Sequence, residues 1–426
     1  NRMFETKKLH NFHDAVPYMM YYGKVMDNDR IVDRGLAVYM KAPHSYTGED
    51  VVEFQMHGSV EALRSVLSLA LRHGAVPADK GEFTKRAFLN GRLDLTQAEA
   101  VIDLIKAKSD KSFDVALEQL EGALSAKIKD IRALLVDVLV NLTVNIDYPD
   151  EDIEEMTYEK LFKDVSNIRD YIDNLLKTAD TGKILNEGLK VSIVGKPNVG
   201  KSSLMNALIG ENRAIVTDIP GTTRDTIEET ISVRGIPVVI TDTAGIHETD
   251  DLIEQIGISK SKESFNNADL IIFVIDSSQE LSLEDFDIMK HIGERNTIVL
   301  LNKTDKGQVV LRKQIVNEIN NVFIIESAVS KGIGIKELAD RIEDLVYAGK
   351  VNQQNSVMVT NVRHERILKE AFTAAGDALQ MIEMKQPLEF IEIDVNRCYE
   401  LLGEIIGQTA TDDIIEKVFE RFCLGK

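Results

Sequence analysis

A lysine and a serine follow a glycine-framed loop near the middle of the chain. In the stretch VSIVGKPNVGKSSLMNAL, residues 191–208, Gly195 and Gly200 enclose four residues, and Lys201 and Ser202 follow at once. This is the G-x-x-x-x-G-K-[ST] spacing of a phosphate loop. Backbone N–H groups of such a loop surround the β-phosphate, and the next helix adds donors and the positive end of its dipole. We expect Lys201 to neutralise the β- and γ-phosphates and Ser202 to hold Mg²⁺.

Two further motifs supply groups that sense the third phosphate of a nucleotide. Asp242-Thr243-Ala244-Gly245 closes an apolar run that we expect to be a strand. Asp242 can then reach Mg²⁺ through water, and the Gly245 N–H can contact the γ-phosphate. Thr223, in the sequence GTTRD, is the candidate switch threonine that completes Mg²⁺ coordination when the γ-phosphate is present.

Two motifs near the end of the same region can read a guanine base. Asn302-Lys303-Thr304-Asp305 closes the run TIVLL, and the Asp305 carboxylate can accept hydrogen bonds from guanine N1 and N2. Adenine lacks those donors and leaves a buried carboxylate unpaired, so the site selects GTP over ATP. The segment containing Ser327 and Ala328 closes VFII and is expected to place a backbone N–H near guanine O6. All these motifs occur in the order that a GTPase requires.

The residue that positions the attacking water is less obvious. Ile246 follows the DTAG motif, where a Ras-like protein has a glutamine that orients water, and an aliphatic side chain cannot do so. Glu254, nine residues past Gly245, can swing in to position water, or it is one more exposed acid in an acidic helix. Asn198, inside the phosphate loop, can bind a monovalent cation that replaces an arginine finger, or it caps a turn.

Composition limits the class of protein. The chain has 426 residues, 44% of them hydrophobic, which predicts two to four packed domains, and no apolar run approaches the ~20 residues of a membrane span. Its two cysteines, Cys398 and Cys423, form no CxxC, which disfavours structural zinc or a disulfide scaffold and favours the cytoplasm. The net charge of −20 argues against a broadly basic nucleic-acid surface. Because the chain opens at Asn1 rather than Met, we expect its natural N-terminus to be missing.

Hydrophobic periodicity predicts a multidomain α/β chain. Residues 1–92 mix expected strands (IVDRGLAVYM, DVVEFQMHG) with an amphipathic helix, SVEALRSVLSLALRHG, as in an α+β domain. Residues 93–188 and 352–426 have a helical period, and we expect them to pack as one helical domain. Between them, residues 189–351 alternate buried strands with helices, as in a Ras-like P-loop GTPase domain with a mostly parallel sheet. The acidic run 147–155, which contains a proline, is expected to be a solvated turn.

Several stretches together resemble one family. The phosphate loop, TDIPGTTRD, DTAG followed by an aliphatic residue, NGRLDLTQAEA, YPDEDI and the terminal FCLGK closely resemble the bacterial MnmE/TrmE tRNA modification GTPases. The similarity covers essentially the whole chain, and the FCLGK terminus is its most specific feature. It implies a Ras-like G domain inserted into a helical domain, after an α+β domain that resembles folate-binding enzymes.

The resemblance implies roles for residues in the G domain. Ser202 and Thr223 match the family's Mg²⁺ ligands, and Glu254 its water-orienting catalytic glutamate. The family hydrolyses GTP when two G domains pair across a homodimer in a potassium-dependent manner. The implied K⁺ ligands are Asn198, Thr217, Ile219 and Thr222. The implied nucleotide-binding residues are Asn198, Val199, Gly200, Lys201, Ser202, Ser203, Thr217, Thr222, Thr223, Asp242, Thr243, Ala244, Gly245, Asn302, Lys303, Asp305, Ser327 and Ala328.

The resemblance also implies a folate site in the amino-terminal domain. Glu53, Arg92 and Lys426 fall where the family contacts a tetrahydrofolate derivative, 5,10-methylene- or 5-formyl-tetrahydrofolate. The family often has Lys where this chain has Arg92, and its glycine-rich opening segment is absent here. Cys423 matches a terminal cysteine linked to the modification chemistry, or it is a small apolar residue of the last helix.

The function implied by the resemblance is tRNA modification. A potassium-activated GTP hydrolase would act with an FAD-dependent partner of the MnmG/GidA type, in a heterotetramer. Together they would install a (carboxymethyl)aminomethyl group at C5 of tRNA wobble uridine, with tRNA bound mainly through the partner. One alternative is a ribosome-assembly GTPase of the Era or Der kind, although no GXXG loop of a KH module is evident after residue 352. Another is an independent folate transferase regulated by GTP.

Overall fold

The computed structural model forms two compact units. It describes residues 3–9, 11, 14–147, 158–211, 228–242, 265, 267–319, 322–347, 357–423 and 425. The first unit comprises Asn1–Ile102 with Gly403–Lys426, and the second comprises Asp103–Leu402. The domain boundaries expected after residues 92, 188 and 351 were placed where the sequence pattern changes. They remain predictions.

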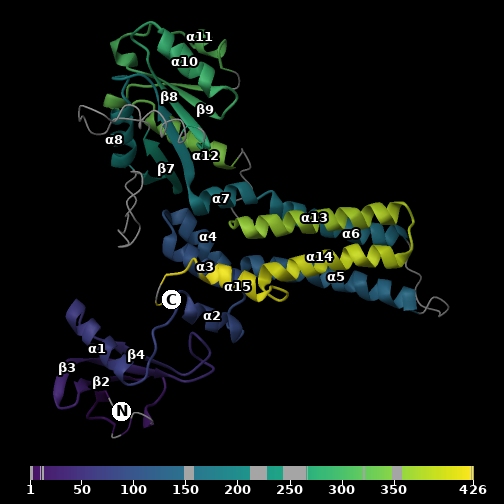
Figure 1. The fold of residues 1–426 in the computed structure, drawn as a ribbon. Helices are drawn as coiled ribbons and strands as arrows, with labels where there is room; N and C mark the ends of the chain where they lie inside the picture. Colours follow the sequence, from purple (N-terminus) through teal and green to yellow (C-terminus); the bar gives the residue numbers. More distant parts are fainter. Residues whose placement is uncertain are drawn as a thin grey trace. The chain divides into compact units, whose positions relative to one another are not determined.

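An antiparallel sheet covered by one helix forms the amino-terminal part of the first unit (Figure 1). The strand order is β1-β2-β3-β4, and α1 contributes Val66 and Leu69 to a core shared with Tyr21 and Val25 of β2. Tyr22, between those two strand residues, is exposed, as expected where side chains alternate between the faces of a sheet. The elements are β1 Phe4–Glu5, β2 Met20–Asp27, β3 Arg30–Met40, β4 Val51–Gln55 and α1 Val60–Arg72.

The sequence pattern predicted β3, β4 and α1 correctly but missed β1 and β2. In β2 the apolar alternation is interrupted by Gly23 and Lys24. Gly23 is required there because a Cβ would overlap the Glu5 carbonyl of the neighbouring strand. Because the close approach of two backbones requires glycine at this position, the alternating apolar pattern that predicts a strand is interrupted in β2.

The first unit also contains a small helical core. Helix α15 packs against α3 through Leu95, Ala98 and Phe419, and Phe422 belongs to the same cluster. Gly81 adopts φ +66° at the start of α2, and a Cβ there would lie 2.8 Å from the Phe422 side chain, so a larger residue would collide with the carboxyl-terminal segment. The helices are α2 Glu82–Leu89, α3 Leu95–Lys106 and α15 Asp412–Phe419.

Long helices form the first part of the second unit. Helix α13 packs along α6, which also contacts α5 (Figure 1). The expected 3.6-residue period is confirmed: Ile128, Leu135 and Leu142 of α5 share one buried face. The acidic run and its proline lie largely in 148–157, outside the described residues. The helices are α4 Asp110–Leu120, α5 Ala123–Asp147, α6 Tyr158–Leu176, α7 Ala179–Glu187, α13 Val362–Glu383 and α14 Leu388–Ile406.

A six-stranded sheet forms the second part of this unit. The order is β10-β9-β8-β5-β7-β6, and every pair is parallel except β6 with β7. All residues of β8 and β9 are buried, as expected of parallel strands covered on both faces. The strands are β5 Leu189–Val194, β6 Glu228–Val233, β7 Ile236–Asp242, β8 Leu270–Asp276, β9 Thr297–Asn302 and β10 Phe323–Glu326.

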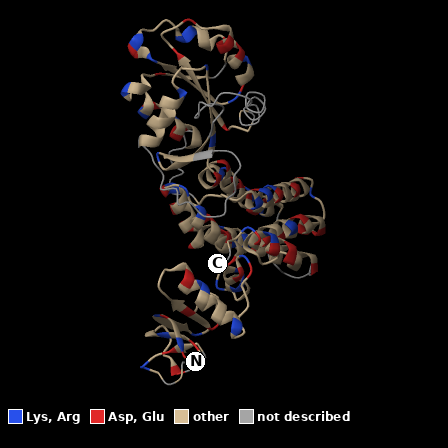
Figure 2. Ribbon diagram, turned by 60° about the vertical axis from the view of Figure 1, so that its left-hand side comes forward, with Lys and Arg blue, Asp and Glu red and all other residues tan. Residues whose placement is uncertain are grey.

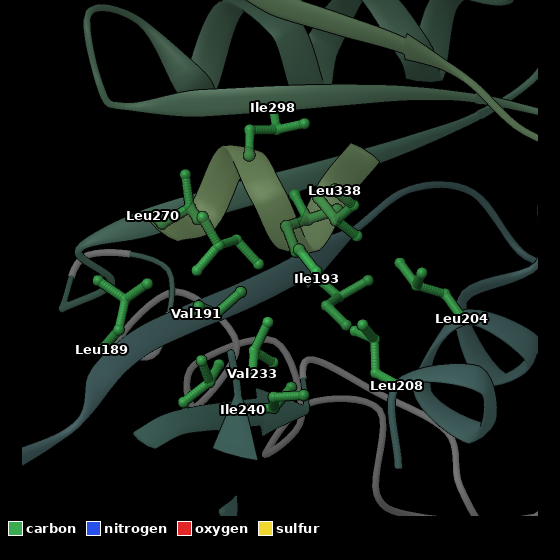
Figure 3. Close-up of a cluster of buried hydrophobic side chains, with 14 of the residues drawn as sticks. Leu189, Val191, Ile193, Leu204, Leu208, Val233, Ile240, Leu270, Ile298 and Leu338 are labelled. Carbon is green, nitrogen blue, oxygen red and sulfur yellow. The ribbon is translucent and has the colours of Figure 1, made fainter. Parts of the chain in front are cut away.

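Helices cover both faces of this sheet. On one face, Leu204 of α8 and Leu338 of α12 belong to one buried cluster with Val191 and Ile193 of β5 (Figure 3). On the other, α10 contributes Met289 to a cluster around Phe273 of β8. These two layers confirm the expected P-loop GTPase fold with a mostly parallel sheet; only the antiparallel strand β6 was not predicted. The helices are α8 Lys201–Glu211, α10 Leu283–Ile292, α11 Arg312–Val316 and α12 Ile335–Tyr347.

Two chain crossings connect the sheet domain to the long helices, as expected of an insertion. Helix α7 runs through Gly188 directly into β5, and the returning segment lies beside α7, where the Val359 N–H donates to Thr178 Oγ1 at 3.1 Å. Acidic and basic residues recur along the helices of the second unit (Figure 2). Among the helices of the described ranges, none has the length and apolar character needed to cross a membrane.

Candidate nucleotide-binding site

The phosphate loop connects the carboxyl end of β5 to the amino end of α8. Gly195 has φ +149°, and a Cβ there would overlap the carbonyl oxygen of Val274. Gly200 has φ +110°, and a Cβ there would overlap the side-chain amide of Asn302. Both glycines of the motif are therefore required by close approach of neighbouring strands as well as by backbone conformation. Asn198 also has a positive φ, +64°, which asparagine tolerates better than most residues.

Lys201 lies folded back over the loop that precedes it. Its Nζ donates hydrogen bonds to Gly195 O at 2.6 Å and to Lys196 O at 2.8 Å. Both acceptors are neutral carbonyls, so phosphate oxygens would be stronger partners for the ammonium group. Ser202 and Ser203, in the first turn of α8, are exposed, and their hydroxyls are therefore accessible to a ligand or a hydrated cation.

Asn302 fastens the phosphate loop to the segment that we expect to read guanine. Its Nδ2 donates to Val199 O at 2.8 Å, and its Oδ1 accepts from the Val329 N–H at 3.1 Å. The residue is 3% exposed, so both amide groups are satisfied in a buried position. One side chain thus joins the phosphate loop to the segment that follows β10, which explains why an asparagine stands at the end of β9.

Lys303 provides a second connection to the phosphate loop. Its Nζ donates to Asn198 O at 2.6 Å and to Asp276 Oδ2 at 2.7 Å. Burial raises the pKa of Asp276, but hydrogen bonds from Lys303 and Ser278 outweigh it and leave this pKa below its usual value. Asp276 was not predicted as part of the site. The available signal was its position, because it ends the entirely apolar strand β8 at the edge where the motifs meet.

The two segments that we expect to read the base lie against each other. Thr304 Oγ1 donates to Ser327 O at 3.0 Å, and Asp305 follows in a short 3₁₀ turn, where its carboxylate pairs with Lys331 at 3.2 Å. The Ala328 N–H donates to Ile333 O at 3.2 Å within its own loop. The structure therefore brings the NKTD segment and the Ser327–Ala328 segment together, while the contact with guanine O6 stays a prediction.

Other predicted residues lie beyond the described part of the chain. Asp242 ends β7 as expected, and its backbone pairs with Ile193 next to the phosphate loop, but its side chain is outside the described atoms. In the described ranges, no group of three or more His, Cys, Asp or Glu side chains is arranged to hold a metal. The predicted residues outside the description are Thr217, Ile219, Thr222, Thr223, Thr243, Ala244, Gly245, Glu254 and Lys426.

The candidate folate residues of the first unit occupy separate surroundings. Glu53 is exposed on β4 and accepts from Gln55 Nε2 at 3.0 Å. Arg92 is exposed, and the aliphatic part of its side chain lies against Gly48, at which a Cβ would be 3.4 Å from the Arg92 Cγ. Cys423 is half-buried, and its carbonyl accepts from the Gly81 N–H at 3.3 Å. Among the described atoms, no hydrogen bond or ion pair connects Glu53, Arg92 and Cys423 with one another.

The second cysteine has a different environment. Cys398 is completely buried in α14, and burial raises the pKa of its thiol to about 12. Since the thiolate is the reactive form, this thiol is inert near neutral pH. Cys423, by contrast, is half-buried.

Two family models together match nearly the whole chain. The model described as the GTP-binding protein TrmE N-terminus matches residues 1–92, and the model described as the MnmE helical domain matches residues 95–423. The chain belongs to the MnmE family. The family resemblance based on the phosphate loop, the switch motifs and the FCLGK terminus is thereby confirmed.

Curated relatives extend this MnmE assignment along the full sequence. The tRNA modification GTPase MnmE of Clostridioides difficile (strain 630) is 50% identical over 407 residues, 96% of this chain and 89% of the relative. MnmE of Bacillus subtilis (strain 168) is 44% identical over 429 residues, 100% of this chain and 94% of the relative. Among solved structures, Aquifex aeolicus Era bound to GDP·AlF4⁻ is 26% identical, covering 43% of this chain and 65% of its own, with a TM-score of 0.28. The assignment rests on the family models and on the two MnmE relatives.

Proposed function

We propose that this MnmE-family chain binds and hydrolyses GTP and serves in tRNA modification. The observation that carries the proposal is the junction of the motifs at one sheet edge. Asn302 donates to Val199 O, Lys303 donates to Asn198 O, and Thr304 donates to Ser327 O. A phosphate loop is thus fastened to a segment suited to reading guanine. A ribosome-assembly switch of the Era or Der kind would share this domain, whereas the MnmE relatives match the chain from end to end.

The residues that are described fit a nucleotide with its magnesium ion. Lys201 is held by two backbone carbonyls that phosphate oxygens can replace, and Ser202 offers a hard oxygen ligand of the kind that Mg²⁺ prefers. Thr223 would provide the second protein ligand. Mg²⁺ would neutralise charge on the β- and γ-phosphates, while Asp305 would accept hydrogen bonds from the guanine edge. Adenine has no such donors at the corresponding positions, so GTP is the expected substrate.

Hydrolysis needs positive charge and an oriented water molecule. We assign the orientation of the attacking water to Glu254, because the residue after DTAG is Ile246, whose side chain has no polar group. We assign the charge to K⁺, held by Asn198, Thr217, Ile219 and Thr222 as in the family. The exposed side chain of Asn198 and its left-handed backbone suit this role, since the amide oxygen is available to a cation at the phosphate side. Pairing of two G domains in a homodimer would close the site around both ions.

The first unit would supply the one-carbon chemistry. Glu53 would pair with pterin donors, and the cations of Arg92 and Lys426 would meet the folate glutamate tail. Cys423 would act in the modification step carried out with an FAD-dependent MnmG/GidA-type partner. The product would be wobble uridine with a (carboxymethyl)aminomethyl group at C5. GTP turnover would move the G domains and would not enter the carbon chemistry.

Replacing sodium with potassium tests the hydrolytic part of this proposal. We expect GTP hydrolysis by the full chain to be at least about tenfold faster in K⁺ than in Na⁺, because the cation stabilises charge in the transition state. Asn198→Ala should remove the difference. Asn206→Ala, which alters an exposed asparagine on α8, should preserve it. Equal rates of phosphate release in both salts with the unaltered chain would overturn the assignment of K⁺.

The tRNA part of the proposal is tested by analysing the modification of wobble uridines. In a host whose own gene is deleted, the chain should restore the C5-modified uridine, as measured by mass spectrometry of digested tRNA. Cys423→Ala should leave the uridine without the completed modification, because the half-buried thiol would take part in the chemistry. Cys398→Ala should restore it fully. Unmodified uridine with the unaltered chain and its host partner present would contradict a role in this modification.

A further inference from the structure

A second lysine of the phosphate loop, Lys196, forms an ion pair with Asp285, a residue outside all of the motifs. Lys196 directly follows the first glycine of the loop, and its Nζ lies 2.6 Å from Asp285 Oδ2 and donates to Ser282 Oγ at 2.9 Å. The Lys196 side chain is 18% exposed and that of Asp285 is 1% exposed. This ion pair is therefore nearly buried, unlike the exposed ion pair of Arg234 with Asp340 in the same domain. It fastens the loop to the start of α10.

Asp285 is more than a helix cap. Its Oδ2 accepts from the Ser282 N–H at 2.9 Å, as in a capping box, and also from Ser282 Oγ at 3.0 Å. A cap needs an acceptor oxygen but no buried charge. Asp285 Oδ1 is also buried and accepts no hydrogen bond from the described residues. A carboxylate in this position requires a cation nearby, and Lys196 is the cation that pairs with it in the described structure.

The pair is connected to the lysine that would meet the phosphates. The Lys196 carbonyl accepts a hydrogen bond from Lys201 Nζ at 2.8 Å. The side chain of Lys196 thus fixes the position of its own backbone, and that backbone holds the ammonium group of Lys201. At the far end of the loop, Lys303 links Asn198 O to Asp276. Two lysine–aspartate pairs therefore hold the loop at two points, and the aspartates come from the end of β8 and from the helix α10 that follows it.

We propose that Asp285 is a positioning residue of the nucleotide site, acting through Lys196 on the phosphate loop and on Lys201. The inference rests on the proposed binding of GTP. Asp285 directs Lys196 toward α10, so Lys201 is the loop lysine that meets the phosphates. It also restricts the loop to the conformation in which backbone N–H groups surround the β-phosphate. Loss of the carboxylate charge weakens nucleotide binding at the phosphate end and leaves reading of the base intact.

Asp285→Asn is the variant that isolates the charge. The asparagine oxygen can still accept from the Ser282 N–H, so the helix cap is retained while the ion pair is lost. Kd values for GTP, GDP and ITP are measured by isothermal titration with the full chain. We expect each Kd to rise about tenfold, the change typical of losing one charge-assisted contact. ITP lacks the guanine N2 amino group, so the ratio of the GTP and ITP affinities reports on Asp305 and should not change.

Matched variants separate positioning from a general loss of structure. Glu284→Gln removes the same charge from the neighbouring, exposed residue of α10 and should leave all three Kd values unchanged. Lys196→Met should weaken binding about as much as Asp285→Asn, and Lys196→Arg, which can still form the pair, should keep most of the affinity. The double variant Lys196→Met with Asp285→Asn should have Kd values less than about twofold above those of either single variant. Both changes remove the same interaction, so their effects should not multiply.

The outcomes distinguish this inference from the function on which it rests. If the unaltered chain binds GTP and Asp285→Asn leaves its Kd within twofold or lowers it, the positioning role is wrong and GTP binding stands. If the losses at 196 and 285 multiply in the double variant, the two residues act independently and the inference is likewise overturned. A changed GTP-to-ITP ratio would indicate a loosened domain instead of a displaced loop. If the unaltered chain binds no GTP, the proposed function fails and the inference fails with it.

Discussion

The two candidate sites of this chain are held in place in different ways. In the sheet domain, distant segments are joined directly, for example by Asn302 Nδ2 to Val199 O and by Lys303 Nζ to Asn198 O. In the first unit, Glu53 and Arg92 are exposed and have no such connection to each other in the described structure. Parallel strands end at the same edge of a sheet, so their terminal residues meet within one chain. Glu53 lies on the antiparallel strand β4, whereas Arg92 lies between α2 and α3, so the two described residues share no common sheet edge.

Gly200→Ala should break the nucleotide site and leave the first unit unchanged. A Cβ at this position, with φ +110°, would overlap the Asn302 amide that holds Val199 O. We expect the affinity for GDP to fall by about tenfold to a hundredfold, because a buried hydrogen bond is lost and the loop is displaced. Titration with GDP measures the effect. Titration with 5-formyl-tetrahydrofolate should give the same affinity as the unaltered chain.

A second glycine in the same region provides the control. Gly210 lies near the end of α8, and a Cβ there meets no atom within 4 Å. Gly210→Ala should therefore keep the affinity for GDP and stabilise the helix slightly. An equal loss of affinity in both variants would show that α8 tolerates no added Cβ. In that case the close approach to Asn302 would not be the cause.

The buried Cys398 makes the unfolding free energy of the chain depend on pH. The pKa of Cys398 is raised from 9.0 to about 12 by burial, so the folded chain keeps a proton that the unfolded chain loses above pH 9. The stabilisation is complete below pH 9 and is lost as pH rises toward 12, with a slope of about 1.4 kcal/mol per pH unit. We expect the unfolding free energy of the unaltered chain to decline more steeply over this range than that of Cys398→Ala. Parallel curves in chemical denaturation would contradict the burial of the thiol.

The positions of Asn302 and Lys303 in the fold were predicted from their motif, whereas the residues that pair with lysines of the site were not predicted. Asn302 and Lys303 were placed at the end of a strand because a known spacing follows an apolar run, and β9 ends there. Asp276 and Asp285 also lie at the ends of elements, but their partners are lysines 27 and 89 residues away in sequence. No local pattern encodes such a pair. Only the strand order, which places β8 beside both β5 and β9, brings them together.

The same reasoning accounts for what the sequence revealed of the fold. Parallel strands buried on both faces are continuous apolar runs, so β5, β8 and β9 were recognised. Strand β6 was missed because it begins with two glutamates and pairs antiparallel at the edge of the sheet. Edge strands need less hydrophobic surface than central ones and give a weaker signal.

Exchanging the base specificity tests the central claim most directly, namely that this sheet edge is a guanine nucleotide site. Asp305 follows β9 in a short 3₁₀ turn, and we expect its carboxylate, which pairs with Lys331 at 3.2 Å, to accept from guanine N1 and N2. In Asp305→Asn the amide can instead donate to the C2 carbonyl of xanthine, where guanine has an amino donor. Competition binding should show the unaltered chain preferring GTP over both XTP and ATP, and the variant preferring XTP by at least about tenfold. An unchanged preference for GTP in the variant would contradict the assignment of Asp305 and, with it, of the site.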